Sequence, residues 1–114
     1  ETPSRGLFDG GGPSRFAANG LEVDRAERRA SRDGQPISLK PKEFDLLCYF
    51  LRHPGVVLTR EALLREVWGY DFPIDTRTVD VHIRGLRQKV EVDPSEPRLI
   101  ETVRGYGYRF VSRR

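Results

Sequence analysis

The side chains best suited to chemistry in this sequence are guanidinium groups, and they are concentrated in its last third. Residues 76–114 contain nine Lys or Arg against five Asp or Glu, whereas residues 1–75 contain eleven against twelve. Arginine donates paired hydrogen bonds to phosphates and to the edge of guanine. A local excess of positive charge therefore favours a polyanionic partner.

Other chemically reactive residues are too few for a catalytic or metal site. Cys48 is the only cysteine, and His53 and His82 are the only histidines. A nucleophile needs a base beside it, and structural zinc needs four ligands. Cys48 lies among apolar residues, which indicates an inert core position. We therefore expect no enzyme, no metal and no cofactor.

The arginines of this region belong to a predicted helix over residues 76–91. An apolar stripe recurs at helical spacing: Val79, Ile83, Leu86 and Val90. The opposite side carries Arg77, Val81, Arg84 and Gln88. Glycine in a helix costs about 1 kcal/mol relative to alanine, so we expect another surface to approach Gly85 closely. The outer face is either a solvated face of an ordinary amphipathic helix or a binding surface.

The elements around this helix are predicted from turns and periodicity. Asn19-Gly20 and Asp33-Gly34 are typical of tight hairpin turns, so four short antiparallel strands are predicted before residue 40. Helices are predicted over Pro41–Arg52 and over Arg60–Trp68, the second capped by Thr59. A hairpin over residues 99–111 follows the basic helix, with residues 104–107 at its tip.

Three helices followed by a hairpin have the layout of a winged helix-turn-helix. The fold class is α+β, with a four-stranded N-terminal antiparallel sheet, three helices and a C-terminal β-hairpin wing. The major groove of DNA admits one helix, in which Arg84 suits guanine, Asp80 suits the cytosine amine and Val81 suits the thymine methyl. Arg104 at the hairpin tip suits a narrow minor groove.

The sequence also resembles the C-terminal effector domains of OmpR/PhoB-type response regulators. The matching segments are LKPKEFDLL (39–47), LTREALL (58–64), VWG (67–69), RTVDVHI (77–83), LRQK (86–89) and IETVRGYGYRF (100–110). The last two segments together are highly specific, and the resemblance spans roughly residues 16–111. It implies a winged-helix DNA-binding domain over residues 15–114 that binds promoter DNA, usually on tandem half-sites.

The resemblance assigns DNA contacts to individual residues. In the third helix, placed in the major groove, they are Arg77, Thr78, Asp80, His82, Arg84 and Arg87. In the wing, placed in the minor groove, they are Thr102, Arg104 and Tyr108. Arg60 and Trp68, at the ends of the second helix, match backbone contacts. From its residue type alone, His82 is either a phosphate contact or a structural residue on the helix flank, and the resemblance favours the former.

The loop at 69–75, between the second and third helices, carries three large apolar side chains. These either pack on the core or form a protein-binding surface. The resemblance matches the loop to one that touches RNA polymerase in some members, through Tyr70, Asp71, Phe72, Pro73 and Ile74. It also implies a phosphorylatable receiver domain before Glu1, which makes residues 1–14 a flexible interdomain linker within a two-component phosphorelay.

Two alternatives to a DNA-binding transcription regulator are open. A winged-helix module can instead bind protein through the same surfaces, and the two are distinguished by the salt dependence of DNA affinity. An enzyme needs a cluster of catalytic groups, which the sequence lacks. No apolar run approaches the roughly 18 residues of a membrane span, so we expect a cytoplasmic protein without a membrane partner.

Overall fold

Four short antiparallel strands begin the described part of the chain, which comprises residues 14–18, 20–69 and 75–111 of a computed structural model. They form one sheet in sequence order: β1 (Arg15–Ala18), β2 (Leu21–Asp24), β3 (Arg29–Arg32) and β4 (Gln35–Ile37). Asp33 and Gly34 both have positive φ, 50° and 85°, as the predicted tight turn requires. The predicted four-stranded sheet is therefore confirmed.

Three helical regions follow the sheet. They are α1 (Pro41–Arg52), α2 (Arg60–Leu63) continuing into the π-helical turn η2 (Leu64–Trp68), and α3 (Arg77–Val90). Thr59 caps α2 as predicted, since its Oγ1 accepts a 3.0 Å hydrogen bond from the Ala62 amide. The extent of the second helix is as predicted, but its second half has π geometry, which periodicity does not reveal.

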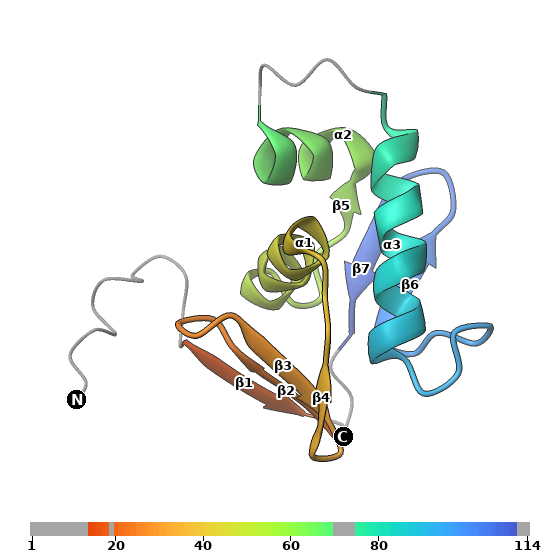
Figure 1. Cartoon of the computed structure of the whole chain (residues 1–114). Helices are drawn as coiled ribbons and strands as arrows, with labels where there is room; N and C mark the ends of the chain where they lie inside the picture. Colours follow the sequence, from red (N-terminus) through yellow and green to blue (C-terminus); the bar gives the residue numbers. More distant parts are fainter. Residues whose placement is uncertain (1–13, 19, 70–74, 112–114) are drawn as a thin grey trace.

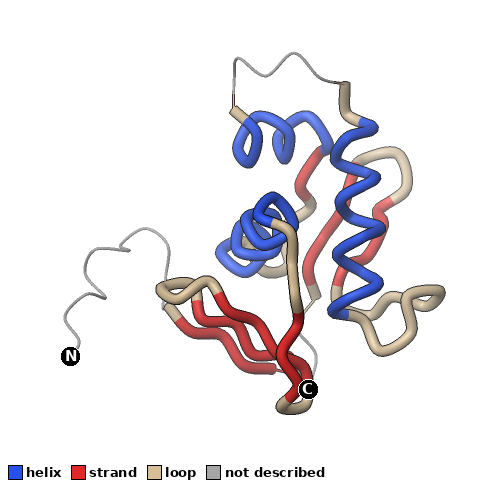
Figure 2. The backbone as a smooth tube through the Cα atoms, viewed as in Figure 1, coloured by secondary structure: helices blue, strands red, loops and turns tan. Residues whose placement is uncertain are grey.

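A second sheet ends the described chain. Its three strands have the order β5 (Leu58–Thr59), β7 (Gly107–Phe110) and β6 (Ile100–Val103). Gly107 is required where β7 meets β5, because a Cβ there would overlap the carbonyl oxygen of Leu58. Strands β6 and β7 form the predicted wing (Figures 1 and 2).

The core lies where α1 and α3 face each other and the sheets. The α3 stripe is fully buried as predicted: Val79, Ile83, Leu86 and Val90. Strand residues from both sheets complete this core, including Leu21, Val23, Ile100 and Phe110. Figure 1 shows α1 between the first sheet and α2, with α3 lying over the hairpin of β6 and β7. The structure therefore has the predicted winged-helix architecture.

Gly85 allows a close approach, but from within the chain. A Cβ at Gly85 would lie 2.5 Å from Oε2 of Glu43 on α1. Glu43 is 3% exposed, and its Oε1 accepts from the Lys89 ammonium at 2.7 Å and from the Lys40 amide at 3.0 Å. Burial raises the pKa of Glu43, but these two donors outweigh it and the net pKa is lowered. The approaching surface that we expected at Gly85 is therefore α1.

Candidate nucleic-acid interface

The outer face of α3 presents unpaired side chains to solvent. Val81 is 67% exposed, and Arg84 is also exposed. Among the described residues, none forms a hydrogen bond or an ion pair with the Arg84 side chain. An exposed guanidinium beside a small apolar side chain can reach a base edge without first breaking an internal contact.

Arg77 lies at the start of the same face but is already paired. Its Nη2 and Nε donate to Oδ2 of Asp75 at 3.0 and 3.3 Å, and its amide donates to Oδ1 at 2.8 Å. The guanidinium hydrogen bonds lower the pKa of the Asp75 carboxyl. The Asp75 carboxylate thus accepts from the first amide of α3. Both side chains are largely exposed, so a phosphate can replace Asp75 as the partner of Arg77 at little cost.

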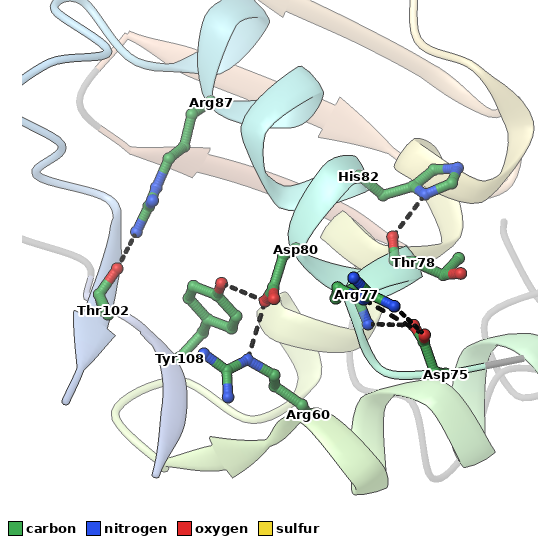
Figure 3. A network of polar contacts seen from close by, with 9 residues as sticks. All are labelled: Arg60, Asp75, Arg77, Thr78, Asp80, His82, Arg87, Thr102 and Tyr108. Carbon is green, nitrogen blue, oxygen red and sulfur yellow. Dashed lines mark hydrogen bonds and ion pairs between the residues drawn. The ribbon is translucent and has the colours of Figure 1, made fainter. Parts of the chain in front are cut away.

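Asp80 joins three elements of the interface. Its Oδ1 accepts from Nε of Arg60 at 2.9 Å and from the Tyr108 hydroxyl at 2.6 Å (Figure 3). Arg60 begins α2 and Tyr108 lies on β7, so one carboxylate links both helices to the wing. Burial raises the pKa of Tyr108, and the Asp80 hydrogen bond raises it further. Asp80 is therefore held in place, with Oδ2 left for another donor.

Arg87 is directed towards the wing. Its Nε and Nη2 donate to the Ile100 carbonyl at 3.1 and 2.7 Å. Nη2 also donates to Oγ1 of Thr102 at 2.8 Å (Figure 3). Its guanidinium carbon lies 5.5 Å from the centre of the Tyr108 ring. Burial lowers the pKa of Arg87, which still remains charged. Most of its donors are thus engaged with β6.

His82 and Trp68 pack together on one flank of α3. The ring centres are 4.9 Å apart in an edge-to-face arrangement, and Nδ1 of His82 lies 2.8 Å from the Thr78 carbonyl oxygen. A carbonyl only accepts, so Nδ1 carries the proton in this contact and Nε2 is the ring nitrogen left for another partner. The contact brings the end of η2 against α3. It therefore places Trp68 and His82, both predicted to contact the DNA backbone, next to each other.

The wing tip presents a basic and an aromatic side chain. Arg104 and Tyr106 are exposed, Tyr106 at 68%, on either side of Gly105, whose φ is 83°. The Tyr106 amide closes the turn by donating to the Val103 carbonyl at 2.9 Å. The sequence pattern predicted no role for Tyr106. The sequence feature that could have identified Tyr106 is its position between two glycines at a hairpin tip, because an aromatic side chain there cannot reach the core.

The remaining sequence predictions fall outside this face. The five residues assigned to a polymerase-contact loop, Tyr70, Asp71, Phe72, Pro73 and Ile74, lie outside the described residues. Cys48 packs beside the core, and burial raises the pKa of its thiol to about 11, so it is a protonated, unreactive thiol at neutral pH. The described residues contain no cluster of His, Cys, Asp and Glu able to hold a metal ion.

No helix in the described ranges has the length and apolar character needed to cross a membrane.

Comparison with known families gives a match over most of the chain. Residues 34–110 match the family described as "Transcriptional regulatory protein, C terminal". The DNA-binding response regulator MtrA of Mycolicibacterium smegmatis is 51% identical over 89 residues, which are 78% of this chain and 39% of MtrA. The chain thus spans well under half the length of the curated relatives that it matches.

Solved structures agree with this match. The response regulator DrrB of Thermotoga maritima, an OmpR/PhoB homologue, superposes with a TM-score of 0.82 at 33% identity, covering 88% of this chain and 45% of DrrB. The DNA-binding domain of Klebsiella pneumoniae RstA, solved in complex with its RstA box, superposes with a TM-score of 0.76 at 34% identity. That match covers 85% of this chain and 96% of the RstA domain.

Proposed function

The chain belongs to the family of C-terminal domains of transcriptional regulatory proteins, of the OmpR/PhoB type, and we propose that it binds double-stranded promoter DNA sequence-specifically as the effector domain of a response regulator. The observation that carries this proposal is the outer face of α3, where exposed, unpaired Arg84 adjoins exposed Val81. The family consists of DNA-binding domains and not of enzymes.

In this proposal α3 lies in the major groove and reads bases with its outer face. Arg84 donates to guanine, and Val81 contacts a thymine methyl. Asp80 offers Oδ2 to a cytosine amine while Oδ1 stays bonded to Arg60 and Tyr108. The two internal hydrogen bonds of Oδ1 restrict the orientation of Asp80 and support this base-reading role.

A second set of residues positions the domain on the phosphate backbone. Its proposed members line the rim of α3 and the ends of the preceding helix: Arg60, Trp68, Arg77, Thr78, His82 and Arg87. The exposed pairing of Arg77 supports this role, because a phosphate can displace Asp75. The Arg60 side chain is 46% exposed, and this exposure supports a phosphate contact there while its Nε stays bonded to Asp80.

The wing is proposed to enter the adjacent minor groove. Arg104 gains there from the negative potential of a narrow, A·T-rich stretch. Thr102 and Tyr108 both hydrogen-bond to side chains of α3; Thr102 is exposed on the wing, whereas Tyr108 is 6% exposed and is proposed to act through Asp80. The exposed position of Arg104 at the turn supports this placement.

The wider assembly is also a proposal. We expect two copies on tandem half-sites, a receiver domain joined through residues 1–14, and a cytoplasmic location where promoter DNA is found. The loop at 69–75 is proposed to contact RNA polymerase, on the basis of its three large apolar side chains.

Selection of bound sequences from a random DNA pool tests the proposal, followed by affinity measurements between 50 and 200 mM salt. We expect an enriched motif and an affinity that falls steeply with salt, since each phosphate contact adds about −0.9 to the slope of log K against log salt. A pool without enrichment, or an affinity that does not change with salt, would instead favour a protein-binding module.

A further inference from the structure

Glu91 directly follows α3 and has a buried side chain with a specific set of partners. It is 6% exposed. Its Oε1 accepts from the amides of Arg98 and Leu99 at 2.9 and 3.1 Å, and its Oε2 accepts from the amides of Leu99 and Ile100 at 3.0 and 2.8 Å. The carboxylate therefore binds three consecutive amides at the start of β6.

These hydrogen bonds connect α3 to the wing independently of the chain between them. Residues 92–96 are exposed and form turns, and Val92 is 82% exposed. A segment of this kind restricts the distance between its ends only weakly. Hydrogen bonds from backbone amides to a buried carboxylate are short and charge-assisted, and they fix direction as well as distance.

Arg87 holds the same strand from one turn earlier in α3. The Ile100 amide donates to Glu91, and the Ile100 carbonyl accepts from Arg87 at 2.7 Å. Strand β6 is at the edge of its sheet, so these two groups face away from β7. Arg87 of α3 and Glu91 just after it, two side chains of opposite charge, thus satisfy both polar groups of one edge residue and fix β6 along the helix.

We propose that Glu91 is a positioning residue for DNA binding: it sets the place of the wing relative to α3, and so the offset between the major-groove contact of Arg84 and the minor-groove contact of Arg104. This inference rests on the proposed function. A fixed offset makes the second groove contact effectively intramolecular once the first has formed, and a variable offset removes that advantage.

The first test combines substitutions at Glu91 and Arg104 on a selected DNA site. Glu91→Gln keeps the size of the side chain but directs an amide donor at backbone donors. In the wild-type background, Arg104→Ala is expected to lower affinity about tenfold, as for a groove-reading arginine. In the Glu91→Gln background, the same substitution is expected to lower it less than about twofold, because a displaced wing no longer delivers Arg104.

Glu96→Gln is the matched control, since Glu96 is an exposed carboxylate on the same connecting segment. It removes the same charge without touching β6, and Arg104→Ala is expected to keep its tenfold effect there. An equal Arg104→Ala effect in all three backgrounds would overturn the proposal. Loss of DNA binding by the wild-type domain would instead overturn the proposed function, so the two failures are distinguishable.

A second variant leaves Glu91 intact and decides the question even where Glu91→Gln does not fold. One glycine is inserted after Glu96, which lengthens the connection while keeping every hydrogen bond of Glu91. If Glu91 positions the wing, affinity stays within about twofold of wild type, since one added loop residue costs little entropy. If the length of the segment positions the wing, affinity falls by about the same factor as for Arg104→Ala, and the proposal is wrong.

Discussion

Two sides of α3 carry similar polar residues and differ in what holds them. On the outer face, Arg84 has no internal partner among the described residues, and Val81 is 67% exposed. On the side facing the wing, Asp80 and Arg87 hydrogen-bond to Tyr108, Ile100 and other groups. The difference indicates that the outer side is free for a ligand, whereas the residues facing the wing also maintain the shape that presents it.

The anchored side is expected to give the largest effect on stability. Arg87→Ala should lower the free energy of unfolding by about 2–3 kcal/mol, because it removes charged hydrogen bonds and leaves the carbonyl of a buried Ile100 unsatisfied. Urea denaturation measures this change. Gln88→Ala is the control on the neighbouring exposed position, and equal stability of the two variants would contradict an anchoring role.

The free side is expected to affect binding and not stability. Arg84→Ala should weaken specific DNA binding by about 2 kcal/mol and relax the preference at one or two base pairs, while unfolding is unchanged. Binding to selected and random DNA is compared with thermal melting. If affinity fell equally on both DNAs, Arg84 would be a phosphate contact, and a lower melting temperature would place it on the anchored side.

Substitution of Asp80, which also faces the wing, is expected to have a smaller effect on stability than substitution of Arg87. Asp80→Asn should lower the free energy of unfolding by about 1 kcal/mol, since the Arg60 and Tyr108 donors lose a charged acceptor. Asp75→Asn is a matched control, because among the described residues the Asp75 side chain pairs with Arg77 alone and asparagine caps a helix equally well. If Asp75→Asn lowered the free energy of unfolding as much as Asp80→Asn, the hydrogen bonds of Asp80 to Arg60 and Tyr108 would not contribute specifically to stability.

The smallest expected effect is a pH dependence at Tyr108. Burial and then the Asp80 hydrogen bond raise the pKa of Tyr108 in the folded state. A raised pKa means that the folded protein holds this proton more tightly, so its contribution to stability is present below about pH 10 and is lost as the pH rises through the folded pKa. Denaturation of wild type and Tyr108→Phe between pH 8 and 11 measures it. The variant should lose less stability than wild type over this range, and parallel curves would exclude the effect.

Local sequence patterns were sufficient to predict most of the fold. Periodicity predicted the buried stripe of α3, and the Asp33-Gly34 turn together with the strand pattern predicted the first sheet. The bounds of α1 were predicted to the residue, whereas α3 is one residue shorter at each end than expected. These features depend on neighbours within one or two turns, so they can be recognised in the sequence.

Tertiary structure alone decided which polar residues are free and which are engaged. The sequence placed Arg84 on the outer face of the basic helix and predicted DNA contacts for both Arg84 and Arg87, with no sign that Arg87 is bonded within the protein. Their environments come from distant segments: Glu43 approaches Gly85 and pairs with Lys89, 46 residues away, and Tyr108 reaches Asp80 across 28 residues. Helical periodicity specifies in which direction a side chain leaves its own helix, whereas the partner of that side chain depends on how separate elements pack. The sequence therefore determined the basic helix, and only the fold decided which of the arginines on this helix remains free.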